Sequence, residues 1–260
     1  MTLSRRNALS LFATSLACPA CLGVARAETG HPAAGGPPHW DYHGEAGPER
    51  WGTLAPEFRV CSLGLEQTPV DLRAAVPAAI GSLSVALART AQQVLNNGHT
   101  IQVNCAPGAR TEILGTQYDL LQFHFHHPSE HLLAGRGFDL ECHFVHRSAA
   151  GALAVLGVFI QPGAENKALQ PIWQAMPASA GPARALDSAI DPALLLPEQR
   201  QYFRYAGSLT TPPCSEGVLW TLFKTPVEAS AEQIRRFAQL FPVNARPPQA
   251  VNRRFVLESI

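Results

Sequence analysis

The chain has 260 residues, of which 46% are apolar and 15% charged, which is enough for one sizeable hydrophobic core. Its 20 basic and 20 acidic residues cancel, and this argues against a nucleic-acid partner, because such proteins carry excess basic charge. The 20 glycines and 22 prolines favour strands joined by turns over a helical bundle. No apolar run reaches the roughly 20 residues that a membrane span needs.

Residues 1–27 have the features of an export signal. Two adjacent arginines, Arg5 and Arg6, precede an apolar stretch, and the segment ends in small residues around Ala27. The arginine pair is typical of the twin-arginine route. We expect cleavage after Ala27, followed by a flexible leader at residues 28–38 that is rich in glycine, proline and alanine.

The remainder, residues 39–260, contains no further linker and no repeat, and is predicted to be one domain. Helical patterns are few, the best being Ala229–Leu240 with Ser230 as its cap and a weaker one being Glu165–Met176. Short apolar or alternating runs predict strands at Leu83–Leu87, Thr100–Cys105, Tyr118–His127, Leu140–His146, Leu153–Ile160 and Val218–Thr225. The domain is therefore expected to be mainly β with peripheral helices.

Four cysteines follow the signal: Cys61, Cys105, Cys142 and Cys214. An exported protein meets an oxidising compartment, so at least one disulfide is expected, and three full pairings are open. No two of these cysteines have CxxC spacing, so the sequence does not support a metal site made of thiolates.

Histidines concentrate in two of the predicted strands. Alternate residues of a strand share a face, so His124 and His126 point to one side and the phenylalanines between and before them to the other. The neighbouring run around His143 can supply a third imidazole. Three such ligands with an open fourth position are what catalytic zinc requires. His127 and His146 are interpreted as structural.

Seven motifs occur in order along the chain: His39-Trp40-Asp41-Tyr42, Gln67-Thr68-Pro69-Val70-Asp71, Leu95-Asn96-Asn97-Gly98-His99, Gln122–His131, Glu141–His146, Gly207–Pro213 and Asn244-Ala245-Arg246-Pro247. Together they resemble the α-class carbonic anhydrases, in the form found in exported bacterial members. The resemblance implies a twisted, mostly antiparallel sheet of about ten strands, a zinc ion in a cone-shaped cleft, and a periplasmic location.

The same resemblance assigns the metal site and its partners. His124, His126 and His143 correspond to the three zinc ligands. Gln122 and Glu141 correspond to the groups that hold two of these imidazoles in the required tautomer.

The catalytic positions also follow from the resemblance. Thr210 would accept a hydrogen bond from zinc-bound hydroxide and donate its own proton to Glu130. His99 corresponds to the proton shuttle, a task that suits imidazole because it titrates near neutral pH. A polar wall ordering water between zinc and the shuttle would consist of Tyr42, Asn97 and Gln102, the last of which departs from the residue common in animal enzymes.

Two further features are implied in the same way. An apolar wall for CO2, completed by Thr210 and Thr211, would be formed by Val145, Val155, Leu209, Val218 and Trp220. A disulfide between Cys61 and Cys214 would fix the loop that carries Thr210, and Cys105 and Cys142 would remain thiols.

The predicted function is therefore reversible hydration of CO2 to bicarbonate and a proton by one Zn²⁺ per chain, with zinc-bound hydroxide as the nucleophile. No nucleic acid and no membrane span are involved, and the sequence leaves monomer and homodimer open. Two alternatives remain: a catalytically silent zinc-binding relative, and a zinc esterase. Metal buffering by His31 and His39 is a third, which predicts more than one tight metal per chain.

Overall fold

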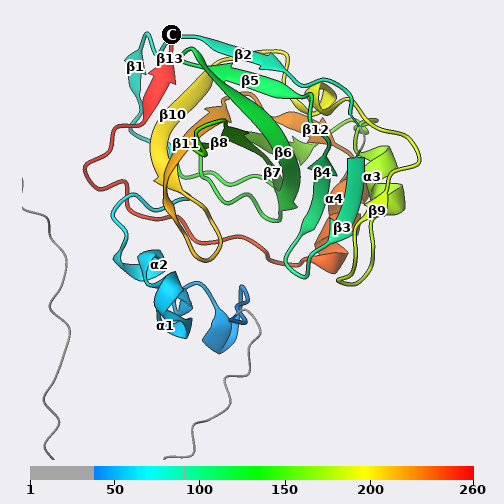
Figure 1. Ribbon diagram of the computed structural model, residues 1–260, viewed down its shortest axis with the longest axis horizontal. Helices are drawn as coiled ribbons and strands as arrows, with labels where there is room; N and C mark the ends of the chain where they lie inside the picture. Colours follow the sequence, from blue (N-terminus) through cyan, green and yellow to red (C-terminus); the bar gives the residue numbers. More distant parts are fainter. Residues whose placement is uncertain (1–37, 91) are drawn as a thin grey trace, which may run out of the picture. The chain divides into compact units, whose positions relative to one another are not determined.

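The computed structural model describes residues 38–90 and 92–260. The predicted export signal (1–27), and all but the last residue of the predicted leader (28–38), lie outside the described residues. The described part is organised around one sheet in the order β1-β13-β10-β11-β8-β7-β6-β4-β3-β9 (Figure 1). Off this path, β12 pairs with β8, β5 with β6, and β2 with β5.

The strands of this sheet, within the described residues, are β1 (Val76–Ala78), β2 (Leu83–Ala86), β3 (Gln92–Asn96), β4 (Ile101–Cys105), β5 (Arg110–Ile113), β6 (Thr116–His126), β7 (Leu140–Ser148), β8 (Leu153–Pro162), β9 (Arg184–Ala185), β10 (Tyr202–Ser208), β11 (Glu216–Phe223), β12 (Val227–Ala229) and β13 (Leu257–Ser259). The helices are short: α1 (Trp51–Leu54), α2 (Val60–Leu63), α3 (Gln170–Ala175) and α4 (Ala231–Leu240), with 3₁₀ turns at Gly44–Ala46, Pro56–Phe58 and Pro192–Leu195. Figure 1 shows α3 and α4 near the β3–β9 end and α1 and α2 outside the sheet. The predicted class, mainly β with peripheral helices, is confirmed.

Most neighbouring strands are antiparallel, as predicted, including the long β6–β7 and β7–β8 pairs. The sheet is nevertheless mixed, because β1–β13, β8–β11 and β8–β12 are parallel. None of the helices in residues 38–90 and 92–260 is long and apolar enough to cross a bilayer.

The two faces of β6 are as different as the alternation predicted. Phe123 and Phe125 are fully buried in the largest core cluster, together with Cys142 and Phe144 of β7. On the other face of the same strands lie His124, His126 and His143. His124 of β6 is the register partner of His143 of β7, and His126 lies two residues further along β6. The rigid pairing of the two strands therefore sets the directions of the three imidazoles.

The two predicted helices form, with different bounds. The helix α4 begins after Ser230, whose hydroxyl accepts from the backbone of Gln233 while the Gln233 side chain accepts from Ser230 N–H, which is a complete capping box. The helix α3 is shorter than the predicted Glu165–Met176. It begins at Gln170, with Pro171 in its first turn, because Asn166 is held in a turn by hydrogen bonds to Gln233 and to the β12 backbone.

The buried His146 makes the fold sensitive to acid. It faces the core, where Nε2 lies 3.0 Å from Thr111 Oγ1 and Nδ1 lies 2.8 Å from Phe144 O, and burial lowers its pKa from 6.5 to about 4. Between these values the unfolded chain binds a proton that the folded chain does not, so stability falls as the pH falls. We expect this histidine to cost about 2 kcal/mol of unfolding free energy between about pH 7.5 and about pH 5.

Urea unfolding of the wild type and of His146→Gln at the two pH values measures this. The variant should lose about 2 kcal/mol less than the wild type on acidification, although it is less stable at the higher pH. An equal acid loss in both proteins would contradict the assignment.

Candidate functional site

Three imidazoles converge on the face of β6 and β7 opposite the large core. His126 and His143 are each 1% exposed, and one ring nitrogen from each of His124, His126 and His143 lies within 4.8 Å of the others. Ring centroids are 5.0 Å apart for His124 and His126, and 4.6 Å for His126 and His143. The structure thus brings together the three residues expected to be metal ligands.

A different acceptor holds the second nitrogen of each imidazole. His124 Nδ1 lies 2.9 Å from Gln122 Oε1, and His143 Nε2 lies 2.7 Å from Glu141 Oε1. For His126 the acceptor is a backbone carbonyl, with Nδ1 placed 2.7 Å from Asn244 O. Since each of these ring nitrogens donates, the nitrogens left facing the shared space are His124 Nε2, His126 Nε2 and His143 Nδ1, as unprotonated acceptors.

These donors fit a divalent cation. Burial lowers the pKa of His126 to about 4 and that of His124 well below its usual value, which keeps both imidazoles neutral, as metal ligands must be. His126 Nε2 is buried and has no hydrogen-bond partner among residues 38–90 and 92–260. A buried acceptor without a partner is costly, and a metal ion in the shared space would satisfy it. Three imidazoles suit zinc, copper, iron or nickel better than magnesium or calcium.

The carboxylate of Glu130 faces the same space. Its Oε2 lies 3.6 Å from His126 Nε2 and 3.9 Å from His143 Nδ1, and in the described part of the chain it has no hydrogen-bond partner. Burial raises the pKa of Glu130 to about 7, while the His143 ring, the Arg246 amide and the Thr210 side chain act in the opposite direction. A cation on the three imidazoles would further favour the ionised form.

The carboxylate of Glu141 is a second buried anion, and it is fully satisfied. Its Oε2 accepts from the backbone N–H groups of Glu130 and His131 (2.9 and 2.8 Å), and its Oε1 accepts from the rings of His131 and His143 (2.7 Å each). Burial alone would raise the pKa of Glu141, but these donors hold it well below its usual value. Glu141 is therefore a permanent acceptor that fixes the His143 ring.

The expected proton-path residues lie together on one side of the site. The half-buried His99 stacks on Trp40, with ring centroids 3.7 Å apart, and burial lowers its pKa. Asn97 Oδ1 accepts from His99 N–H (2.9 Å), and Asn97 Nδ2 donates to Gln102 Oε1 (3.3 Å). Gln102 is the register partner of His124 on the neighbouring strand, so these polar residues extend from the imidazole cluster to His99.

Tyr42 is 8% exposed, and its pKa is raised well above 10 by burial and by the nearby charges of Glu130 and Asp41. Its phenol therefore stays protonated and can donate a hydrogen bond. The effect of Glu130 on this pKa means that Tyr42 lies within electrostatic reach of the Glu130 carboxylate. The Tyr42 ring packs edge-on against the Trp40 ring, with the ring centroids 5.4 Å apart.

The five residues expected to form the apolar wall all belong to the second core cluster, either as buried members or packed against it: Val145, Val155, Leu209, Val218 and Trp220. They come from β7, β8 and β11 and from the segment after β10. The Trp220 ring lies 4.9 Å from the His143 ring, so the cluster borders the imidazoles directly. Thr210 is buried and Thr211 is half-buried in the following loop.

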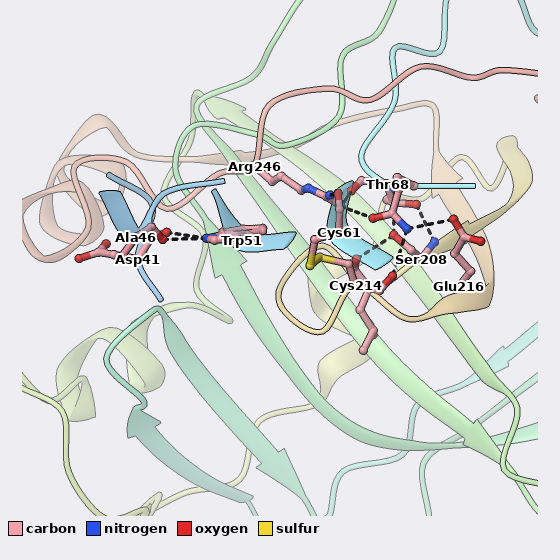
Figure 2. Close-up of a disulfide and its surroundings, with 11 residues drawn as sticks. Asp41, Ala46, Trp51, Cys61, Thr68, Ser208, Cys214, Glu216 and Arg246 are labelled. Atoms are coloured by element: carbon pink, nitrogen blue, oxygen red, sulfur yellow. Dashed lines mark hydrogen bonds between the residues drawn. A yellow bond between two sulfur atoms is a disulfide. The ribbon is translucent and has the colours of Figure 1, made fainter. Parts of the chain in front are cut away.

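The predicted pairing of cysteines is confirmed. A disulfide joins Cys61 of α2 to Cys214, which follows the segment containing Thr210 (Figure 2). Cys105 and Cys142 are free thiols, as expected. His127 and His146 belong to neither group of potential metal ligands in the described residues, in agreement with their structural interpretation.

Sequence reasoning assigned no role to three residues that shape this site. His131 Nε2 lies 2.6 Å from Tyr205 OH, so a second potential ligand group, His131, Glu141 and His143, is already consumed by hydrogen bonds. Asn244 acts through its carbonyl, and Arg246 donates its amide N–H to Glu130 Oε1 (2.8 Å). All three lie in motifs that resemble the carbonic anhydrases, and these motifs were the only sign in the sequence that the three residues belong to the site.

Comparison with known proteins agrees with this geometry. Residues 46–260 match the family described as eukaryotic-type carbonic anhydrase. A carbonic anhydrase from Nostoc sp. is 46% identical over all of this chain and 99% of the relative, and one from Pectobacterium carotovorum is 43% identical over 84% and 90%. The solved α-carbonic anhydrase of Thermovibrio ammonificans, in complex with the inhibitor sulfanilamide, superposes with a TM-score of 0.83 at 47% identity, covering 85% of this chain and 100% of that one. The chain belongs to the α-carbonic anhydrase family, a family of zinc-dependent enzymes.

Proposed function

We propose that this enzyme hydrates CO2 reversibly with one Zn²⁺ held by His124 Nε2, His126 Nε2 and His143 Nδ1. The observation that carries the proposal is the convergence of three acceptor nitrogens, one of which is buried and has no hydrogen-bond partner in the described residues. When bound, zinc acidifies water and so supplies hydroxide for attack on CO2 at neutral pH. Three neutral ligands preserve the charge that this chemistry uses.

Glu130 and Thr210 would orient the nucleophile. A threonine hydroxyl can accept one hydrogen bond and donate another. If Thr210 donates to Glu130, its lone pair accepts from the attacking hydroxide, which fixes the direction of attack. The buried carboxylate of Glu130, held by the Arg246 amide, is a suitable acceptor. Preorganised hydrogen bonds of this kind cost no rearrangement at the moment of reaction.

The apolar side of the site would bind the substrate. CO2 carries no charge and accepts hydrogen bonds weakly, so residues such as Val145, Val218 and Trp220 suit it better than they suit bicarbonate. Together with Val155, Leu209 and Thr211 they would hold CO2 beside the nucleophile and favour release of the charged product. Tyr42, Asn97 and Gln102 would order water toward His99.

His99 would export the proton that each turnover releases. We expect His99→Ala to lower the maximal rate of CO2 hydration about tenfold or more in dilute buffer, while kcat/KM for CO2 stays unchanged. Added imidazole should restore part of the lost rate, because it accepts the proton directly. Stopped-flow hydration at several imidazole concentrations measures this, and equal rates with and without His99 would contradict the shuttle role.

Two rival functions differ from this proposal in their reactions. A silent zinc-binding relative would hold zinc and hydrate no CO2, and a dedicated esterase would hydrolyse activated esters faster than it hydrates CO2. We expect rapid CO2 hydration and slow hydrolysis of 4-nitrophenyl acetate by the same preparation. Zinc-loaded protein that is inactive toward CO2 would exclude the proposal. Metal buffering by His31 and His39 predicts a second tightly bound zinc per chain when the zinc content of the protein is measured. Of these two histidines, His31 lies outside the described residues.

We also propose that residues 1–27 are a twin-arginine export signal, that residues 28–38 are a leader and that residues 39–260 form the catalytic domain, which works in the periplasm. The Cys61–Cys214 disulfide supports an oxidising compartment. N-terminal sequencing of the protein from a periplasmic extract should begin at or near Glu28. A chain that keeps Arg5 and Arg6 and stays in the cytoplasmic fraction would contradict this.

A further inference from the structure

The loop that carries Thr210 is attached at its start to residues 61–68. Thr68 N–H donates to Ser208 Oγ (3.0 Å), and Ser208 N–H donates to Thr68 Oγ1 (2.9 Å). Both residues are fully buried, and Figure 2 shows them side by side. This reciprocal pair sets where the loop leaves β10.

The end of the loop is attached to the same stretch of chain. Cys214 is bonded to Cys61, and its carbonyl accepts from Gln67 Nε2 (3.1 Å), which also donates to Glu216 Oε1 (3.0 Å). Gln67 is only 3% exposed, so its bond to the Cys214 carbonyl is shielded from water. Residues 61–68 therefore form a frame that holds both ends of the Thr210 loop.

The buried guanidinium of Arg246 is hydrogen-bonded to this frame. Arg246 is 2% exposed and donates to Gln67 Oε1 (2.9 Å), to Thr68 O (2.8 Å) and to Cys61 O (2.8 Å), and its charge lies 5.5 Å from the Trp51 ring centre. Figure 2 shows this side chain extending toward Cys61 and Thr68. A planar group bound at three points has little freedom to turn.

The main chain of the same residue holds the catalytic carboxylate. Arg246 N–H donates to Glu130 Oε1 (2.8 Å), although 116 residues separate the two in sequence. The side chain of Arg246 is thus fixed to the frame of the Thr210 loop, and its amide is fixed to Glu130.

We propose that Arg246 and Gln67 form a clamp that sets the position of Glu130 relative to Thr210, so that both are positioning residues for CO2 hydration. This inference rests on the proposed function, because it assumes that Glu130 and Thr210 orient the nucleophile. A small misplacement of an orienting group is enough to slow an enzyme by one or two orders of magnitude.

Two variants open the clamp at different places. Gln67→Met keeps the volume of the side chain and removes its link to Cys214 and Arg246, and Arg246→Lys keeps the charge but cannot span three acceptors. We expect each to lower kcat/KM for CO2 hydration about tenfold, measured well below its melting temperature, with one zinc per chain retained. If Arg246→Lys does not fold, Gln67→Met carries the test.

Arg254 provides a matched control. It also donates to backbone carbonyls in this region, those of Gln67, Ala206, Ala250 and Val251, but it makes no hydrogen bond to Glu130. Arg254→Lys removes several side-chain hydrogen bonds to the same region and should lower the melting temperature while leaving kcat/KM unchanged. An equal loss of kcat/KM in Arg254→Lys would show a general structural effect and overturn the clamp.

A double-mutant cycle with Thr210→Ala separates the two hypotheses. In the Thr210→Ala background, Gln67→Met should cause no further loss of kcat/KM, because the group that the clamp positions is gone. If the losses of kcat/KM from Gln67→Met and Thr210→Ala multiply in the double variant, the clamp is overturned and the role of Thr210 stands. The same conclusion follows if Gln67→Met leaves kcat/KM unchanged while Thr210→Ala lowers it. Full activity of Thr210→Ala alone would instead overturn the proposed function of Thr210, and the clamp with it.

Discussion

Replacing His143 with alanine is expected to abolish zinc retention and, with it, CO2 hydration. His143 is 1% exposed, its ring is fixed by Glu141, and Nδ1 is one of the three convergent nitrogens. Removing one of three protein ligands leaves two, which is fewer than catalytic zinc sites use. Without zinc nothing in the site would lower the pKa of water to near neutral, so we expect the rate to fall about a thousandfold or more.

The measurement is zinc content by elemental analysis after dialysis at micromolar free metal, together with stopped-flow hydration. His127→Ala is the matched control, because this neighbouring imidazole bonds to Pro242 O and takes no part in the cluster. It should keep one zinc and full activity. A His143→Ala protein that still holds one zinc per chain and hydrates CO2 would refute the ligand assignment.

Removing the disulfide is expected to have the largest effect on stability. Cys61 and Cys214 are 153 residues apart in sequence, so the bond restricts most of the unfolded chain. In the chain-entropy account a loop of this length contributes about 5 kcal/mol to the free energy of unfolding. The double variant Cys61→Ser/Cys214→Ser should lose a large part of this, which compares with a typical total of about 5–15 kcal/mol.

Urea unfolding of the oxidised wild type and of the double variant measures the loss. Cys105→Ser is the control, since Cys105 is a free, half-buried thiol, and it should change stability far less. If the free energy of unfolding of the double variant lies within about 1 kcal/mol of the wild-type value, the disulfide does not stabilise the protein in the way proposed.

The part of the site that the sequence could predict lies on two strands. Strand periodicity alone placed His124 and His126 on one face. The structure agrees because β6 is hydrogen-bonded to β4 on one side and to β7 on the other, and this pairing fixes which face each side chain occupies. The family resemblance added His143. The structure brings all three together, as expected.

The remaining part depends on backbone groups that every residue carries. His126 is oriented by the carbonyl of Asn244, 118 residues away, and Glu130 by the amide of Arg246. Side-chain identity cannot reveal such partners, because only the fold decides which carbonyl or amide arrives there. The side chain of Arg246 is informative in retrospect, since a buried guanidinium needs several acceptors.

Strand prediction failed where packing is mixed. The strand β10 did not appear among the predicted runs, because Arg204 and Gly207 interrupt its apolar pattern. In the structure Arg204 lies over the Tyr202 ring and donates to Ile80 O, so a charged residue occupies a buried position of the sheet. Local sequence carries no sign of that remote acceptor.

The most direct test of the account is CO2 hydration by the purified enzyme before and after zinc is removed with a chelator, and again after zinc is restored. We predict rapid hydration that disappears with the metal and returns on addition of one equivalent of zinc per chain. Hydration that persists in protein shown to be free of metal, or that fails to return in protein shown to have rebound one zinc, would contradict it.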